Sequence, residues 1–111
     1  MPAYLITEKG DTIDMRADLG LFDPRDMDAT IDYIQKILET DGYEIIAAVN
    51  AYEGAPAQMY ADELALNNGR KPNDKATEIR DANYVAKGIA IPNDAGIFGP
   101  VLIFTGIDCL E

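Results

Sequence analysis

Apolar residues recur at helical spacing in the first half of the chain. They fall on one face of a helix because successive members are three or four positions apart. Asp23 and Pro24 before this stripe are typical of an N-cap and of a first helical position. The pattern predicts a helix over 24–40, ended by Gly42 in the left-handed conformation. The stripe consists of Met27, Ile31, Ile34 and Leu38.

A second helix is predicted over 74–85, where Asn73 is a typical N-cap residue. Ala76, Ile79 and either Asn83 or Tyr84 would then face inward. Runs of apolar and β-branched residues bounded by turn residues predict strands, and the glycine-containing turn after the first run favours a hairpin. The predicted strands cover 3–7, 12–16, 43–51, 57–61 and 101–105.

The order β-β-α-β-β-α-β predicts an α+β fold, with a mostly antiparallel sheet and two helices packed on one face. The 111 residues are enough for one hydrophobic core, so we expect a single small domain over 1–111. The 43–51 run is apolar on both faces, which favours a central strand.

Acidic residues outnumber basic ones, and the formal net charge is −11. Residues 1–66 contribute −10, residues 67–87 contribute +2 and residues 88–111 contribute −3. Such a chain repels the nucleic-acid backbone and anionic membranes, so neither is an expected partner. A basic protein is the natural partner class, although solubility alone also explains the charge.

Missing residue types exclude most enzyme chemistry. The chain has no histidine and no serine, and Cys109 is its one cysteine. Histidine is the usual general base near neutral pH and the commonest transition-metal ligand. We therefore expect no catalytic residues, no metal site and no cofactor. The single cysteine fits a reducing cytoplasm, and the sequence carries neither a secretion signal nor an apolar run long enough to span a bilayer.

Acidic side chains line the polar face of the first predicted helix. Asp28, Asp32 and Glu39, with Gln35 between them, form a stripe opposite the apolar one. Helical residues four apart rise by about 6 Å, close to the roughly 6–7 Å between phosphates on one DNA strand. The acidic stripe (Asp28, Asp32 and Glu39) is therefore a candidate partner-binding surface that imitates phosphates. A solvated helix face explains the same pattern, and the helix dipole explains the acids near the helix start.

The one locally basic segment precedes the second predicted helix. Free backbone N–H groups at a helix start favour anions, so this segment is a candidate site for a nucleotide-like anion. Helix capping and a solvated turn explain the same residues without a ligand. The candidate anion-binding residues are Arg70, Lys71, Asn73, Lys75 and Thr77.

Four short motifs occur in a characteristic order, at 41–45, 59–63, 72–77 and 97–106. In this order the chain resembles domain-of-unknown-function family 3846, which occurs in phages, plasmids and other mobile elements. The family has no established activity, so the resemblance implies a fold and a genomic habitat.

Together these features predict a non-enzymatic accessory protein of a mobile element that binds a basic host protein. The narrowest form is a nucleic-acid-mimicking anti-defence factor acting on a nucleic-acid-binding host protein. The alternative is a sponge or sensor for a nucleotide-like anion. A homo-oligomer stays open.

Overall fold

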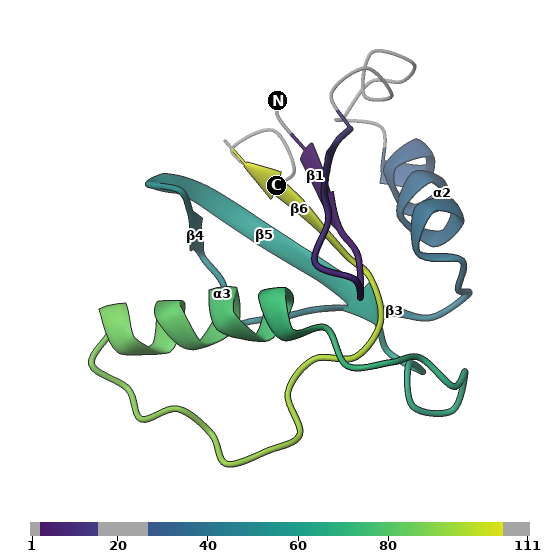
Figure 1. The fold of residues 1–111 in the computed structure, drawn as a ribbon. Helices are drawn as coiled ribbons and strands as arrows, with labels where there is room; N and C mark the ends of the chain where they lie inside the picture. Colours follow the sequence, from purple (N-terminus) through teal and green to yellow (C-terminus); the bar gives the residue numbers. More distant parts are fainter. Residues whose placement is uncertain (1–2, 16–26, 106–111) are drawn as a thin grey trace.

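The sheet is the centre of the fold in the computed structural model, which describes residues 3–15 and 27–105. Every strand pairing is antiparallel, in the order β2-β1-β6-β5-β3, and β4 adds to β5. This arrangement, with two helices in the described ranges, confirms the predicted α+β class (Figure 1). The strands are β1 (Ala3–Ile6), β2 (Thr12–Asp14), β3 (Tyr43–Ile45), β4 (Ala51–Tyr52), β5 (Ala55–Asp62) and β6 (Val101–Thr105); the helices are α2 (Met27–Leu38) and α3 (Asp74–Ala86).

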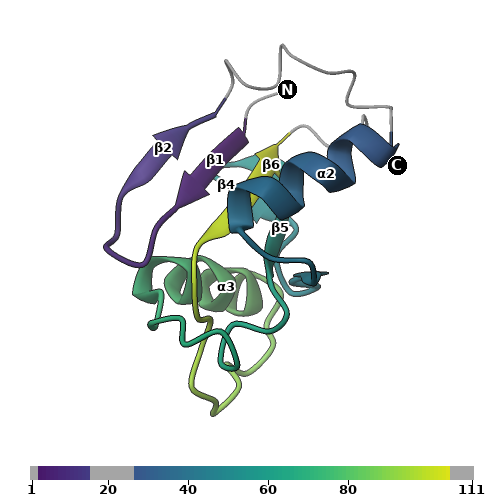
Figure 2. The same ribbon diagram turned by 90° about the vertical axis from the view of Figure 1, so that its right-hand side faces the viewer.

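The two helices cover opposite faces of the sheet, so the prediction that both pack on one face is wrong. Strand β6 is buried throughout, and its side chains alternate between the faces. Leu102 and Phe104 belong to the cluster with Ile34 and Leu38 of α2. Val101 and Ile103 point the other way, into the cluster that includes Ala76 of α3. Figures 1 and 2 show the helices on different sides of β5 and β6.

Helix α2 buries the apolar stripe that the sequence predicts, at Ile34 and Leu38. It ends at Leu38, and Glu39 takes the left-handed conformation with φ 52°. The Thr40 N–H then donates to the Gln35 carbonyl at 3.1 Å, as in a Schellman motif. The prediction that Gly42 fills this position is wrong, since the chain turns three residues earlier. Asp23, Pro24 and the Met27 side chain lie outside the described residues.

The predicted central strand over 43–51 is wrong in length and place. Strand β3 has three residues and lies at the edge of the sheet. The Val49 N–H turns back to the Ile46 carbonyl at 3.0 Å, which breaks the strand. Beyond the break, Asn83 of α3 accepts from the N–H groups of Asn50 and Ala51. A side chain of α3 thus provides the bonds that a neighbouring strand would give.

Asn73 fastens α3 to two strand ends. It is fully buried, and its Oδ1 accepts from the Ala76 N–H at 3.0 Å, as the N-cap prediction requires. Its Nδ2 also donates to the carbonyls of Ile6 and Gly99, at 3.1 and 2.8 Å. The cap residue therefore holds β1, the segment before β6 and the helix together.

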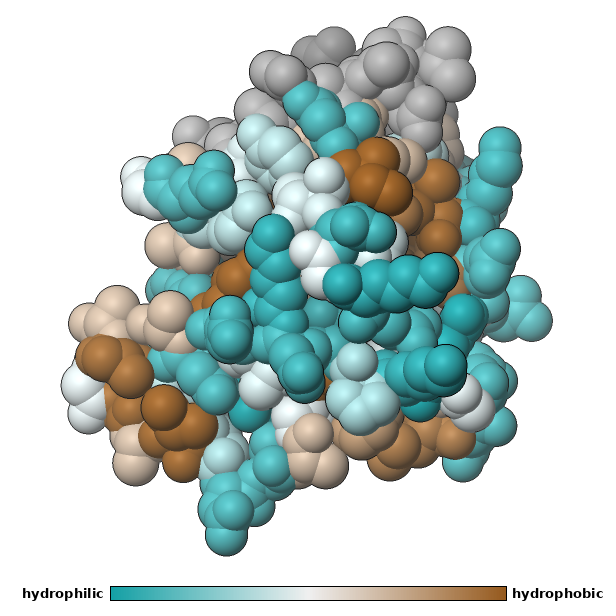
Figure 3. Space-filling view, viewed as in Figure 1, coloured by the Kyte–Doolittle hydropathy of each residue, from teal (hydrophilic) through white to brown (hydrophobic). Residues whose placement is uncertain are grey.

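The face drawn in Figure 3 is largely hydrophilic, and its apolar residues form separate patches. One patch lies over the C-terminal end of α3 and the segment after it, where Val85, Ile89 and Ile91 are about half exposed or more. Exposed apolar residues are common on folded proteins, because apolar atoms contribute more than half of their accessible surface.

Candidate functional site

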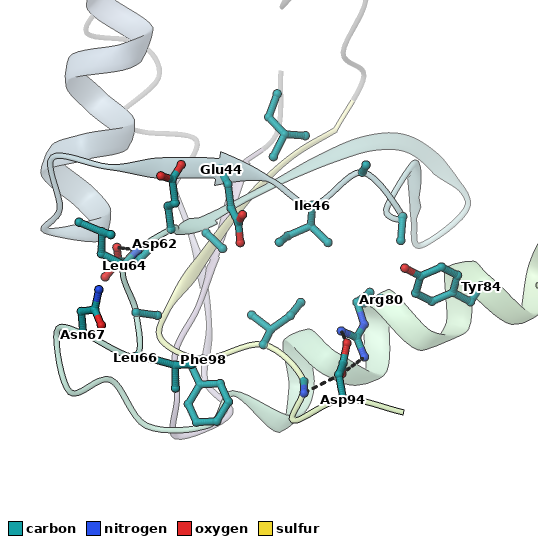
Figure 4. A pocket seen from close by; sticks show the side chains of 18 residues that line it. Glu44, Ile46, Asp62, Leu64, Leu66, Asn67, Arg80, Tyr84, Asp94 and Phe98 are labelled. Atoms are coloured by element: carbon teal, nitrogen blue, oxygen red, sulfur yellow. Dashed lines mark hydrogen bonds and ion pairs between the residues drawn. The ribbon is translucent and has the colours of Figure 1, made fainter. Parts of the chain in front are cut away.

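A cleft opens on the α3 side of the sheet, beside the end of β3. Its volume is about 550 Å³. Its walls come from four segments that are distant in sequence: 44–48 after the start of β3, 61–67 at the end of β5, Arg80 and Tyr84 of α3, and the loop 94–98. Figure 4 shows Glu44 and Ile46 pointing into the hollow from the sheet side, with Arg80 and Tyr84 facing them. We call this hollow the cleft.

Arg80 organises the α3 side of the cleft. Its side chain is 9% exposed, and its terminal nitrogens donate to both carboxylate oxygens of Asp94, at 3.0 and 3.1 Å. Nε and Nη2 also donate to Oδ1 of Asp81, at 3.1 and 3.0 Å. Hydrogen bonds from Arg80, with a further one from the Gly96 N–H, lower the pKa of Asp94 below its ordinary value. The guanidinium charge is therefore balanced within the protein, and Arg80 ties the loop 94–98 to α3.

The sheet side of the cleft is acidic. Partial burial raises the pKa of Glu44, and the charges of Glu63 and Asp62 raise it further. Such a shift means that the negative charge on Glu44 is incompletely balanced. In the part of the chain that the structure describes, neither Glu44 nor Glu63 has an ion-pair partner. A cation placed here would relieve this repulsion.

Exposed apolar side chains border the acidic wall. Leu64 is 42% exposed and Leu66 70%. They line the cleft together with the half-buried Phe98. The cleft thus combines uncompensated carboxylates with apolar surface that water still covers.

Arg70, a predicted anion-binding residue, faces into the protein. Its Nε donates to Oδ2 of the buried Asp62 at 3.3 Å, and its Nη2 donates to the Leu38 and Glu39 carbonyls at the end of α2. Burial raises the pKa of Asp62, but donors from Asn68, Thr40, the Leu64 N–H and Arg70 outweigh it and lower the pKa overall. Arg70 thus has a structural role, linking the end of β5 to the end of α2.

The other predicted anion-binding residues are also engaged with the protein, apart from Lys71. Asn73 is the buried cap, and the Thr77 hydroxyl donates to the Asn73 carbonyl while accepting from the Ile97 N–H. The Lys75 ammonium donates to the Thr12 hydroxyl of the β1–β2 hairpin. Lys71 is exposed, and its backbone N–H donates to Glu8. These contacts account for the residue types without an anion, and anion binding stays a prediction.

The structure places two of the three residues of the acidic stripe on α2. Asp28 and Asp32 are exposed on α2, one turn apart. Glu39 lies beyond the helix end, with its side chain 80% exposed and a carboxylate oxygen 4.0 Å from Nη1 of Arg70. The side-chain amide of Gln35 donates to the Asp41 carbonyl. The regular spacing along the helix axis therefore applies to Asp28 and Asp32 alone.

Sequence reasoning did not identify Arg80, Glu44, Asp62 or Asp94 as site residues. A weak signal existed for Arg80, because it lies four positions after Ala76 on the inward side of α3, where an arginine needs buried partners. No local pattern announces the cleft, because its walls come from separate segments.

Within 3–15 and 27–105, no three His, Cys, Asp or Glu side chains gather as a group that could hold a metal ion. In the same ranges, no helix has both the length and the apolar character needed to cross a membrane. Comparisons with protein-family models, with curated proteins and with solved structures found no match. The resemblance to domain-of-unknown-function family 3846 stays a prediction.

Proposed function

We propose that this chain is a non-enzymatic cytoplasmic accessory protein that binds a basic protein partner through its acidic surface. The supporting observation is the placement of its arginines. Arg70 and Arg80, the arginines in the described part of the chain, are both largely buried against carboxylates. Their positive charge is balanced by Asp62, Asp81 and Asp94, so neither arginine neutralises the exposed carboxylates elsewhere on the chain. Such a surface attracts a cationic partner over distances of about a Debye length, roughly 10 Å at 0.1 M salt.

Two exposed acidic regions support the proposal. Asp28 and Asp32 lie on α2, and Glu44 and Glu63 lie at the cleft. The first pair retains the helical spacing that imitates successive phosphates. A nucleic-acid-mimicking anti-defence role in a mobile element is the narrowest form of the proposal. It rests on Asp28 and Asp32, because Glu39 leaves the helix.

The competing explanation is that the charge serves solubility alone. A capture experiment separates the two. The tagged protein is incubated with host-cell lysate at about 50 and about 200 mM salt, and bound proteins are identified by mass spectrometry. We expect a basic protein at the lower salt concentration and less of it at the higher one, because screening weakens attraction between exposed charges.

Two amide variants complete the test. In the first, Asp28→Asn, Asp32→Asn and Glu39→Gln neutralise the acidic stripe. In the matched control, Asp11→Asn, Asp74→Asn and Glu78→Gln remove the same charge from other exposed positions. The proposal predicts weaker capture by the stripe variant than by the control. Capture of no basic protein at either salt concentration would leave solubility as the explanation.

A further inference from the structure

The cleft has the size of a binding site for a few side chains. Its volume of about 550 Å³ lies within the roughly 300–1,000 Å³ of ligand pockets. Its α3 wall is fixed, because Arg80 holds Asp94 through two hydrogen bonds and Asp94 in turn accepts from the Gly96 N–H. The opposite wall is part of the sheet, through the pairing of Glu44 with Ala61.

The charges of the cleft select against anions. Its lining contains four carboxylates, of Glu44, Asp62, Glu63 and Asp94, and one guanidinium, of Arg80. Asp94 is balanced by Arg80, and Asp62 by Arg70 from outside the lining. Two carboxylates, of Glu44 and Glu63, are left over. A nucleotide or another phosphate would be repelled, whereas one or two cationic groups would balance the site.

The apolar border adds a second requirement. Leu64 and Leu66 keep 42% and 70% of their surface in water. Covering apolar surface is favourable by roughly 25 cal/mol per Å², so an occupant with apolar groups gains where a simple polycation does not. The fitting chemistry is therefore a cation beside a large apolar group.

We propose that the cleft is the docking site for a segment of the protein partner in which lysine or arginine alternates with large apolar side chains. This inference rests on the proposed function and adds the cleft, as a docking site, to the acidic stripe of α2. The cations of the segment lie against Glu44 and Glu63, and its apolar side chains cover Leu64 and Leu66. Arg80 is paired with Asp81 and Asp94. The segment therefore supplies the positive charge that Glu44 and Glu63 lack.

The probe for this site is a synthetic peptide of alternating leucine and lysine, about nine residues long. One control peptide replaces each leucine by glycine, a second replaces each lysine by glutamate, and spermidine represents a free polycation. Backbone amide NMR shifts locate binding and calorimetry measures affinity. We expect shifts concentrated at 44–48, 61–67 and 94–98, and binding at least about tenfold tighter than that of any control, a difference of about 1.4 kcal/mol. No binding of the leucine–lysine peptide, or equal binding of the glycine–lysine peptide, would overturn the proposal.

Matched variants test the location. Glu44→Gln with Glu63→Gln removes two charges at the cleft, and Asp28→Asn with Asp32→Asn removes two on α2. We expect the cleft pair to weaken the peptide about tenfold and the α2 pair less than twofold. Leu66→Ser should weaken it too, whereas Val85→Ser, at a similarly exposed apolar residue outside the cleft, should not. Equal losses from the two charge pairs would show attraction without a docking site.

The same variants separate this inference from the proposed function. A partner captured from lysate that binds the Glu44→Gln, Glu63→Gln protein as tightly as the unmodified one overturns the cleft as docking site and leaves the proposed function standing. Failure to capture any basic protein overturns the proposed function itself.

Discussion

Arg70 reaches the buried carboxylate of Asp62, with Nε 3.3 Å from Oδ2, and the same guanidinium donates to the last carbonyls of α2. One side chain thus joins the end of β5 to the end of α2. Arg70→Gln removes the charge from this junction and leaves a buried carboxylate with fewer donors. We expect the free energy of unfolding to fall by about 1–3 kcal/mol in urea denaturation.

Lys71→Gln is the matched control, because it removes a positive charge from the exposed neighbouring residue. It should change stability by less than about 0.5 kcal/mol. Equal effects of the two substitutions would mean that net charge, and not the contact with Asp62, determines the loss.

Asn73→Asp tests whether the cap residue does more than cap. Asparagine and aspartate are about equally good N-caps, so an ordinary cap tolerates this exchange. Here the Asn73 amide also donates to the carbonyls of Ile6 and Gly99, and a carboxylate would repel both. We expect a loss of about 2 kcal/mol or more in thermal or urea unfolding. A stability within about 0.5 kcal/mol of the unmodified chain would contradict the three-way anchor.

Gly96 lies in the loop 94–98 and packs against Thr77 of α3. A Cβ at Gly96 would lie 2.7 Å from the Thr77 hydroxyl, which accepts from the Ile97 N–H. Gly88 has a similar positive φ, but a Cβ there meets nothing within 4 Å. Both substitutions to alanine strain the backbone, so their difference isolates the clash. We expect Gly96→Ala to lower the melting temperature more than Gly88→Ala does. Equal melting temperatures of the two variants would show that the loop 94–98 shifts to accommodate the added methyl group.

Some of these features can be predicted from sequence, for physical reasons that differ from one element to another. Strand β6 and the Asn73 cap depend on short, local patterns, and the structure has both where they are predicted. The continuous apolar run 101–104 also indicates a strand that is buried on both faces. A strand buried on both faces needs cover on both, which argues against helices on one face.

Other features depend on contacts between distant segments. The end of α2 is set at Glu39, although glycine is the usual residue there. Two residues far along the chain stabilise this turn: Arg70 donates to the Glu39 carbonyl, and Asp62 accepts from the Thr40 hydroxyl. The run 43–51 looks like one strand, but the turn in which the Val49 N–H donates to the Ile46 carbonyl interrupts it, and Ala51 already belongs to β4. The cleft arises from such contacts and has no local signature.

Glu44 gives the acidic wall a pH signature. Its folded-state pKa lies above the ordinary value of about 4.5, because of partial burial and its acidic neighbours. The stability that it contributes is therefore present below about pH 4 and is lost as pH rises through the folded-state pKa. Glu44→Gln cannot titrate, so the stability of this variant relative to the unmodified chain should rise as pH rises through this window.

Asp94→Asn is the control of opposite sign. The pKa of Asp94 is lowered, chiefly by Arg80, so its contribution is present above about pH 4 and is lost on acidification. This variant should be less stable than the unmodified chain at neutral pH. Urea unfolding at several pH values checks both, and the same sign for the two variants would contradict the charge balance described for the cleft.

The most direct measurement of the central claim is the association rate constant of the captured basic partner as a function of salt. It is measured from about 50 to about 200 mM for the unmodified chain, the acidic-stripe variant and the matched amide control. The account predicts a steep decrease with salt for the unmodified chain and a shallower one for the stripe variant, with the control in between, because functional charges steer encounter. Equal slopes for the two variants would contradict it, since the acidic stripe would then act only through its contribution to net charge.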